Sequence, residues 1–335
     1  MKKILGIIFI LLFTGFVVFY IWGSTANLAP EDYSSILSYN DSHTVVNKDT
    51  FSICTYNIGY LSGMTNNLPF IPDQDLFENN LTKAKTLLKI LNADLIGFQE
   101  IDFNSARSFH VDQMEELAIH ANYFQGARAI NWDKNYVPFP SWLPSMQFGE
   151  MLSGQGVLSK YPISNNHIRT LVKPKSNPFY YNAFYLDRLA QIVLIQLNKT
   201  PVIVINVHLE AFVQPTREKH AQTVLEIYRH YAEDYPVLLV GDFNSTPPFV
   251  NNKKYKGDKT MFGFFNEPSL GVAIPKEQYL INEEGNFTFT SQNPSVKIDY
   301  IFYNKDKIAP VNGRVVNEAN DISDHLPVWF QFTLK

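Results

Sequence analysis

Cysteine, arginine and charge are all scarce in this sequence. Cys54 is the single cysteine of 335 residues, which excludes an internal disulfide framework and a zinc site built from several cysteines. Charged residues make up 18%, only seven of them are arginines, and the formal net charge is −4, which argues against a protein that binds nucleic acid mainly by neutralising phosphates. Hydrophobic residues make up 45%, so there is enough apolar side chain for a large core, and disorder as the main state is excluded.

An uncharged apolar run, Ile4–Trp22, follows two lysines near the amino terminus. Its length is close to the ~20 residues that a helix needs to cross a bilayer, and aromatic residues cluster at its far end. We therefore favour an uncleaved transmembrane anchor over residues 1–23. Because the lysines stay in the cytoplasm, the chain after Trp22 would be extracytoplasmic. Ser24-Thr25-Ala26 offers a small-residue cleavage site, which leaves a cleaved signal peptide and a secreted protein as the alternative.

After this segment the sequence predicts a linker over residues 24–49 and one domain over residues 50–335. Apolar residues recur at helical spacing in Asp75–Leu91, so a helix is expected there. A second helix is expected over Asp112–Ala121, and a third after Thr216, which would cap it. The expected strands are Phe51–Ile58, Asp94–Gln99, Gly156–Ser159, Leu189–Leu197, Val202–Val207, Pro236–Val240, Phe287–Thr290, Ile298–Tyr303 and Leu326–Leu334. Many strands interleaved with few helices predict an α+β fold of two packed sheets with helices outside.

Polar residues stand at the ends of these apolar strands. A single Asp after a strand is usually a turn or cap residue, and a lone His is usually structural, but their repetition at strand ends indicates a site built at one rim of the sheets. The blocks are Thr55-Tyr56-Asn57, Gln99-Glu100, Asn206-Val207-His208, Gly241-Asp242-Phe243-Asn244, Ile298-Asp299-Tyr300 and Ser323-Asp324-His325.

In this order the blocks TYN, QE, NVH, GDFN, IDY and SDH resemble the endonuclease/exonuclease/phosphatase superfamily. That family includes deoxyribonuclease I, apurinic endonucleases, neutral sphingomyelinases and inositol-polyphosphate 5-phosphatases. The resemblance runs from about Phe51 to the carboxyl terminus, and the GDFN and SDH blocks are its most specific parts. It implies a four-layer α/β/β/α sandwich of two mixed β-sheets flanked by helices, and magnesium-dependent cleavage of a phosphate ester.

The resemblance also implies roles for individual residues, and the chemistry of phosphate-ester cleavage agrees with them. Such cleavage needs a metal on the phosphoryl oxygens, an activated water, and donors or cations for the developing charge. The expected metal is Mg²⁺, which prefers oxygen ligands. Mn²⁺ and Ca²⁺ are the alternative metals. The expected metal ligands are Glu100, Asn57 and Asp324. The expected catalytic residues are Asp242 (water activation), Asn244 (water or phosphate orientation), His208 and His325 (hydrogen-bond donors to the phosphoryl oxygens), Asp299 (partner of His325) and Arg188 (phosphate contact).

Three other polar residues, Glu210, His220 and His230, are expected on the surface. Some nuclease members of the family carry a tyrosine where this sequence has Leu152 or Ser153, so that phosphate contact is not expected here.

The residues indicate the type of reaction more clearly than they indicate the substrate. Two segments, Asn131–Phe148 and Asn177–Leu186, are rich in aromatic residues. They could pack into the edge of the core, or form an apolar rim beside the metal site. We expect a metal-dependent phosphodiesterase acting outside the cytoplasm and leave its substrate open. A lipid or other amphiphilic phosphodiester, as for a sphingomyelinase or phospholipase C, is one hypothesis. The alternatives are a surface or secreted nuclease and a non-catalytic membrane-anchored binding module. No obligate protein partner is evident.

Overall fold

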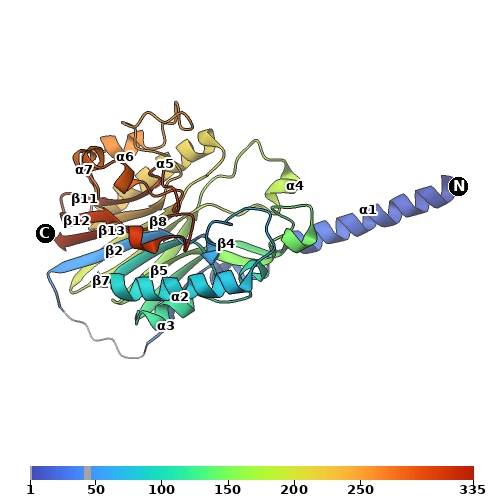
Figure 1. Cartoon of the computed structure of the whole chain (residues 1–335), viewed down its shortest axis with the longest axis horizontal. Helices are drawn as coiled ribbons and strands as arrows, with labels where there is room; N and C mark the ends of the chain where they lie inside the picture. Colours follow the sequence, from blue (N-terminus) through green and yellow to red (C-terminus); the bar gives the residue numbers. More distant parts are fainter. Residues whose placement is uncertain (1, 41–46) are drawn as a thin grey trace.

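Two β-sheets pack face to face in the computed structural model, which describes residues 2–40 and 47–335 (Figure 1). Both sheets mix parallel and antiparallel pairs. The first has the strand order β1 (Ser34–Ser38), β4 (Gln125–Val137), β5 (Gly149–Ser159), β3 (Leu95–Asp102), β2 (Thr50–Asn57), β13 (Val328–Leu334) and β12 (Ile308–Val315). The second has the order β10 (Leu270–Val272), β11 (Asp299–Asn304), β9 (Val237–Asp242), β8 (Thr200–His208), β7 (Leu189–Leu197) and β6 (Ile163–Thr170).

Helices cover the outer face of each sheet. On the first sheet lie α2 (Gln74–Leu91) and α3 (Gln113–His120), and on the second lie α5 (Gln214–Ala232) and α6 (Phe262–Asn266). The shorter elements are α4 (Phe179–Asn182), α7 (Lys276–Ile281) and the 3₁₀ turns η1 (Pro30–Tyr33), η2 (Gly59–Leu61), η3 (Ala106–Ser108), η4 (Pro144–Met146), η5 (Glu284–Asn286) and η6 (Asn317–Ala319). The predicted α+β architecture of two mixed sheets flanked by helices is confirmed.

Helix α2 shows how the local sequence builds the outer layer. The Asp73 side chain accepts a hydrogen bond from the amide of Leu76 at 3.1 Å and caps the helix. The predicted apolar positions, including Phe77 and Leu88, are buried against the first sheet. Asn92 ends the helix in the left-handed conformation. For α5 the expected start was wrong: the helix begins at Gln214, so Thr216 lies inside its first turn and does not cap it.

The segment expected as a linker, residues 24–49, is partly built into the domain. It contains η1 and β1, and β1 pairs antiparallel with β4 at the edge of the first sheet. Residues 41–46 of that segment lie outside the described residues. Another expected strand, Phe287–Thr290, is limited to isolated bridges of Phe289 with Val296 and His325.

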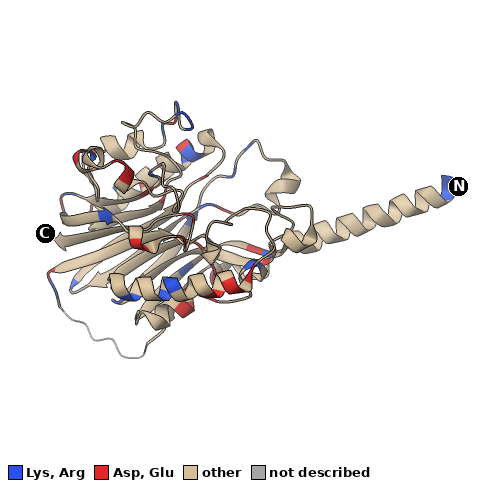
Figure 2. Ribbon diagram, in the orientation of Figure 1, with Lys and Arg blue, Asp and Glu red and all other residues tan. Residues whose placement is uncertain are grey.

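Helix α1 (Lys2–Ser24) projects from the body of the domain (Figure 1). It is 23 residues long, has a mean hydropathy of 2.8 over its most apolar window, and that window is not buried against the rest of the chain. Figure 2 shows charge on this helix only at its amino-terminal end. Length and composition therefore suit a membrane span, and they suit a signal sequence equally well.

Candidate active site

Strand register brings the predicted site residues together at one rim of the sandwich. In the second sheet β8 and β9 run parallel, and His208 is paired with Asp242 at their carboxyl ends. On the other side of β9, antiparallel β11 pairs Asp299 with the same Asp242. In the first sheet the parallel strands β2 and β3 place Asn57 beside Gln99, next to Glu100. Each polar block lies at a strand end because the apolar residues before or after it are held in the core.

Two backbone features aim the carboxylates of this rim. Gly241 precedes Asp242 with φ +143°, and a Cβ atom there would lie 1.9 Å from the carbonyl oxygen of Val207, so only glycine fits. Glu100 has φ +51° at a register shift in the pairing of β3 with β5. Such a bulge turns one side chain out of the alternating pattern. Glu100, the predicted metal ligand, thus has a strained backbone conformation. Such strain often occurs at functional positions.

A cleft of about 820 Å³ opens at this rim, and we divide most of its lining by chemistry into a polar end and an aromatic end. The polar end is lined by Glu100, Arg188, His208, Asp242, Asn244, Asp324 and His325. The aromatic end is lined by Trp132, Phe139, Phe148, Tyr181, Tyr185 and Phe212. Seven of the nine predicted site residues thus line one cavity. The other two, Asn57 and Asp299, contact them from behind.

His325 is held as a cation by a buried carboxylate. Its Nδ1 lies 3.0 Å and 3.2 Å from the two carboxylate oxygens of Asp299, and both residues are almost fully buried. Burial opposes the charge on the imidazole, but Asp299 and Asp242 outweigh it and raise the pKa of His325 well above its usual range. The other ring nitrogen, Nε2, faces the cleft, 3.4 Å from Asn57 Nδ2 and 3.8 Å from Asp242 Oδ2.

Asp242 lies at the centre of the polar end. Its Oδ1 accepts the backbone amide of Asn244 at 2.8 Å, and its Oδ2 lies 3.1 Å from Asn57 Nδ2 and 3.4 Å from His208 Nε2. Burial and the neighbouring Asp299 raise the pKa of Asp242 to about 7, which is the range of an effective general base at neutral pH. Burial, Arg188 and His325 lower the pKa of His208 well below its usual value, so His208 is neutral. The two histidines therefore carry different charges.

Two carboxylates and an amide converge where a divalent cation would fit. Asn66 Nδ2 lies 3.1 Å from Glu100 Oε2 and 3.0 Å from Asp324 Oδ1, and its buried Oδ1 has no hydrogen-bond partner among the described residues. Burial raises the pKa of Asp324; His325 opposes that rise and Glu100 adds to it. Asn57 directs Nδ2 at Glu100 Oε1, 3.3 Å away, while its Oδ1 accepts the amide of Gly59. The close carboxylates of Glu100 and Asp324 match the oxygen ligands that Mg²⁺ prefers, whereas Asn57 and Asn66 point their nitrogens, not their oxygens, at these carboxylates.

A second set of possible ligand atoms fits a metal less well. One atom each from Asp242, Asp299 and His325 lies within 4.8 Å of the other two. A metal-bound histidine must be deprotonated at the ligating nitrogen. In this set Nδ1 of His325 and the Asp299 carboxylate form a buried ion pair at 3.0 Å, whose charges balance without a metal ion. We therefore interpret this set as a hydrogen-bonded chain of charges and place the cation at Glu100 and Asp324.

Arg188 supplies a buried positive charge at the cleft wall. Only 6% of it is exposed, and its Nε and Nη1 atoms have no hydrogen-bond partner among the described residues. A buried guanidinium with unused donors is a site for an anion. A second arginine of the cleft, Arg107, was not expected: it pairs with Asp102 at 2.8 Å and stacks 3.6 Å over the ring of Tyr60.

Two residues expected on the surface are buried instead. Glu210 is fully buried, with the hydroxyl of Tyr185 at 3.2 Å from both of its carboxylate oxygens. His220 is also fully buried on α5, and its Nε2 lies 2.7 Å from the carbonyl of Val172. His230 is exposed, as expected. At the position where a phosphate-binding tyrosine was not expected, Ser153 lines the cleft.

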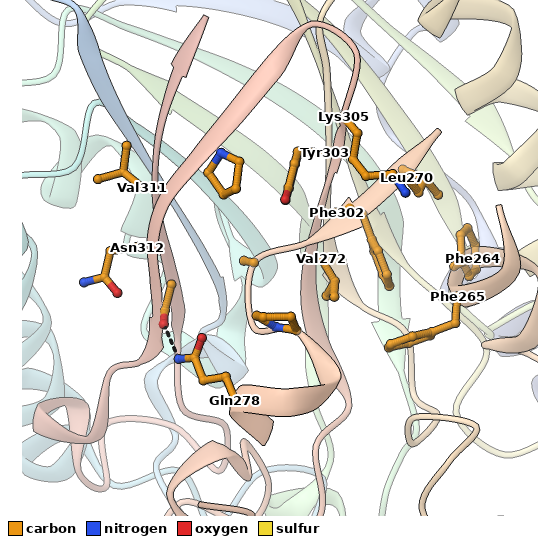
Figure 3. Close-up of a pocket in the computed structure, with 15 residues that line it drawn as sticks. Phe264, Phe265, Leu270, Val272, Gln278, Phe302, Tyr303, Lys305, Val311 and Asn312 are labelled. Atoms are coloured by element: carbon orange, nitrogen blue, oxygen red, sulfur yellow. Dashed lines mark hydrogen bonds between the residues drawn. The ribbon is translucent and has the colours of Figure 1, made fainter. Parts of the chain in front are cut away.

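A second hollow, of about 440 Å³, lies away from these residues (Figure 3). Its labelled lining residues include Phe264, Phe302, Tyr303 and Lys305, on or near α6 and β11. No carboxylate or histidine is among the described residues that line it. It therefore offers no acid–base or metal-binding group comparable with those of the cleft.

The profile of the Endonuclease/Exonuclease/phosphatase family matches residues 54–325, which include all nine predicted site residues. A comparison with curated proteins finds no match.

Several solved structures have a similar fold. One is an endonuclease/exonuclease/phosphatase from Beutenbergia cavernae DSM 12333, with TM-score 0.62 and 20% identity, covering 86% of this chain and 72% of the other. Another is D. rerio TDP2 complexed with single strand DNA product, with TM-score 0.58 and 14% identity, covering 85% of this chain and 100% of the other. The human Nocturnin catalytic domain with bound sulfate anion has TM-score 0.57 and 14% identity, covering 92% of this chain and 100% of the other.

Proposed function

The chain belongs to the endonuclease/exonuclease/phosphatase family, and we propose that it is a Mg²⁺-dependent phosphodiesterase that acts outside the cytoplasm on an amphiphilic substrate. Membership makes it a metal-dependent hydrolase of phosphate ester bonds. The diester, the metal and the substrate class are our inferences. The observation that carries them is the single cleft in which Glu100, His208, Asp242 and His325 meet, with an aromatic end beside them.

Asp242 is placed to activate the attacking water. Hydrolysis needs a base that is ionised near neutral pH yet basic enough to take a proton, and the pKa of Asp242 of about 7 meets both conditions. The backbone amide of Asn244 fixes one carboxylate oxygen, which leaves the other toward His208 and Asn57. The Asn244 side chain donates to the carbonyl of Leu209 at 3.1 Å and also lines the cleft, so it bounds the place where a water would lie.

Positive charge surrounds the position of the phosphoryl group. His325 is cationic, Arg188 has free donors, and neutral His208 can donate one hydrogen bond. Negative charge grows on the phosphoryl oxygens in the transition state, so preorganised cations in a buried site stabilise it more than the ground state. When bound at Glu100 and Asp324, with Asn57 and Asn66 beside them, Mg²⁺ would add Lewis-acid polarisation of a phosphoryl oxygen.

Hydrolysis of bis(p-nitrophenyl) phosphate tests this proposal. We expect Mg²⁺-dependent release of p-nitrophenol that EDTA abolishes. Asp242→Asn should reduce the rate at least ~100-fold, because the base is lost. Asp321→Asn is the matched control, since Asp321 is half-exposed in a surface ion pair with Lys83 and should keep the normal rate. No metal-dependent turnover by the parent protein would favour the non-catalytic binding module instead.

The aromatic end of the cleft favours a lipid or another amphiphilic phosphodiester. A diester has two substituents, and one of them would lie against Phe139, Phe148 and Tyr181 while the phosphate occupies the polar end. A surface or secreted nuclease is the second candidate, favoured by the similarity of the fold to TDP2 complexed with single strand DNA product. Supercoiled plasmid and mixed phospholipid vesicles, assayed side by side, separate the two. Plasmid nicking with intact vesicles would refute the lipid hypothesis.

The extracytoplasmic location rests on α1 and its two amino-terminal lysines. An uncleaved anchor predicts that the full-length protein stays in the membrane fraction after carbonate extraction. It also predicts that protease added to intact cells degrades the domain after Ser24. A shortened protein in the medium would show a cleaved signal peptide, and a protease-resistant domain that becomes accessible on lysis would show a cytoplasmic domain.

A further inference from the structure

The carboxyl-terminal end of helix α1 is held against the catalytic domain. Its last turn accepts two hydrogen bonds from β4, Lys134 Nζ to the carbonyl of Ser24 at 2.8 Å and Asn135 Nδ2 to that of Trp22 at 2.9 Å. Tyr136 of the same strand packs on Phe19 with ring centroids 5.6 Å apart. The exit point of the helix is therefore fixed relative to the domain.

The chain after α1 is held equally firmly. The carboxylate of Asp133 accepts the backbone amides of Asn27 and Leu28, both at 2.8 Å, and the hydroxyl of Tyr33 at 3.1 Å. No flexible tether therefore separates the helix from β4 in this part of the described chain. If α1 spans a bilayer, the face of the domain around its exit point lies at the membrane surface.

Exposed apolar side chains gather on two uncharged loops next to that exit point. Trp142 is 98% exposed and Phe179 is 80% exposed, and Leu143 and Tyr180 beside them are also exposed. We call these four residues the apolar platform. Neither residues 138–148 nor residues 178–186 contain a charged side chain.

Ring contacts and a hydrogen bond tie both loops to the anchor. Phe184 lies 5.6 Å from Tyr20 of α1, and Tyr136 donates to Gln147 at 2.7 Å. Phe139 and Tyr181, one from each loop, pack 5.1 Å apart. Figure 1 shows α4 on the side of the body from which α1 projects.

The same two loops form the aromatic end of the cleft. Phe139 and Pro140 from the first loop and Tyr181 and Tyr185 from the second line it, while Trp142 and Phe179 point to the outside. A surface that binds Trp142 and Phe179 would therefore also lie against the opening of the cleft.

We propose that the apolar platform inserts into the interface of the bilayer that α1 spans, and that the aromatic end of the cleft opens onto that leaflet. The occupant of this surface is a lipid bilayer, because the loop that carries Phe179 and Tyr180 contacts α1 through Phe184, and the platform combines Trp and Tyr, which prefer membrane interfaces, with Leu and Phe. The inference rests on the proposed anchoring by α1. It deepens the proposed function, since the substrate would be an amphiphilic phosphodiester taken from the same leaflet with its apolar part against Phe139 and Tyr181.

Insertion depth tests this proposal without any measurement of activity. Leu143→Cys in the full chain would be labelled with an environment-sensitive nitrobenzoxadiazole fluorophore and placed in phosphatidylcholine nanodiscs. Cys54 is fully buried, so the introduced thiol is the accessible one. We expect blue-shifted emission and quenching by lipids that carry a nitroxide near the headgroup. The control is Ile281→Cys on α7, 87% exposed and remote from α1, which should emit as in water. Water-like emission from both labels would overturn the proposal.

Kinetics on two substrates test the consequence for catalysis. The double variant Trp142→Ser/Phe179→Ser leaves the cleft lining intact, so it should hydrolyse soluble bis(p-nitrophenyl) phosphate within 2-fold of the parent rate. On a phosphodiester lipid in the same proteoliposome membrane it should lose roughly 10-fold or more, since its cleft no longer meets the leaflet. Equal lipid rates in the variant and the parent would contradict the platform. If the parent hydrolyses neither substrate, the proposed function fails, and the fluorescence result alone decides the docking.

Discussion

Asp299→Asn tests the charge on which the proposed chemistry depends. The substitution keeps a side chain of the same size but removes the carboxylate that lies 3.0 Å from His325 Nδ1. A hydrogen bond between charged groups contributes about 1.5–3 kcal/mol. If that interaction serves the transition state, its loss lowers kcat by about 10- to 150-fold.

The pH profile distinguishes this mechanism from general damage to the fold. In the parent enzyme the raised pKa of His325 keeps the imidazole charged over the whole working range. Without Asp299 that pKa falls toward its usual value of about 6.5, so activity should decline as the pH rises through that value and recover below it. Asp299 also raises the pKa of Asp242, so in the variant Asp242 stays ionised at lower pH. Both changes move the optimum toward acid.

The assay is the pH dependence of kcat for bis(p-nitrophenyl) phosphate at saturating Mg²⁺, with thermal unfolding as the check on the fold. A loss of less than about 3-fold with an unchanged pH optimum would refute the role of Asp299. A large loss that is the same at every pH, in a folded protein, would mean that Asp299 acts on structure and not on the charge of His325.

Three further substitutions test other parts of the account. Asn66→Ala removes the amide that bridges Glu100 and Asp324, so the Mg²⁺ concentration for half-maximal rate should rise about 10- to 100-fold, and an unchanged value would place the metal elsewhere. Burial lowers the pKa of Lys297 from 10.5 to about 8, so the unfolded state binds more protons between those values and the stability of the parent rises with pH there. Lys297→Met should therefore be the more stable form at pH 7 by something on the order of 3 kcal/mol, with the difference vanishing near pH 10.5, and a pH-independent difference would contradict the buried ammonium. Gly241→Ala should lower the free energy of unfolding by at least ~2 kcal/mol in denaturant titration, because its Cβ would clash with the backbone of Val207. An unchanged transition midpoint would show that the backbone at the end of β9 shifts to accommodate the methyl group.

The part of the site that follows strand ends could be predicted from the sequence. Asn57, His208 and Asp242 close apolar strands, and the register of neighbouring strands then makes them neighbours in space. Strand alternation and residue type are local signals, so one sequence suffices to locate these residues. The helix α2 was likewise predictable, because its apolar spacing and its Asp73 cap are both local.

Other parts could not be predicted, because they depend on distant contacts. Asn66 lies in a turn with no periodic pattern, and it belongs to the site only because Glu100 and Asp324 approach it from two other elements. His220 and Glu210 carry no sequence signal of burial, since polar residues on a helix or after a strand are usually solvated. Their burial comes from contacts with Val172 and Tyr185 on a loop far away in the chain.

The aromatic segments show a mixed outcome. Trp132 and Phe148 pack into a small cluster, as the core interpretation predicts, whereas Trp142 and Phe179 are exposed, as the rim interpretation predicts. Composition alone gives the same signal for both pairs. Trp132 lies on β4 and Phe148 directly precedes β5, whereas Trp142 lies on the loop between these strands and Phe179 begins α4, so the sheet buries only the first pair.

The central claim is that one divalent cation binds between Glu100 and Asp324 in the cleft that also holds Asp242 and His325. Anomalous scattering from crystals of the protein soaked in Mn²⁺ tests it most directly. The account predicts a peak within bonding distance of the Glu100 carboxylate that disappears in Glu100→Gln. A Mn²⁺ ion bound instead to Asp299 and His325, or outside the cleft altogether, would contradict it.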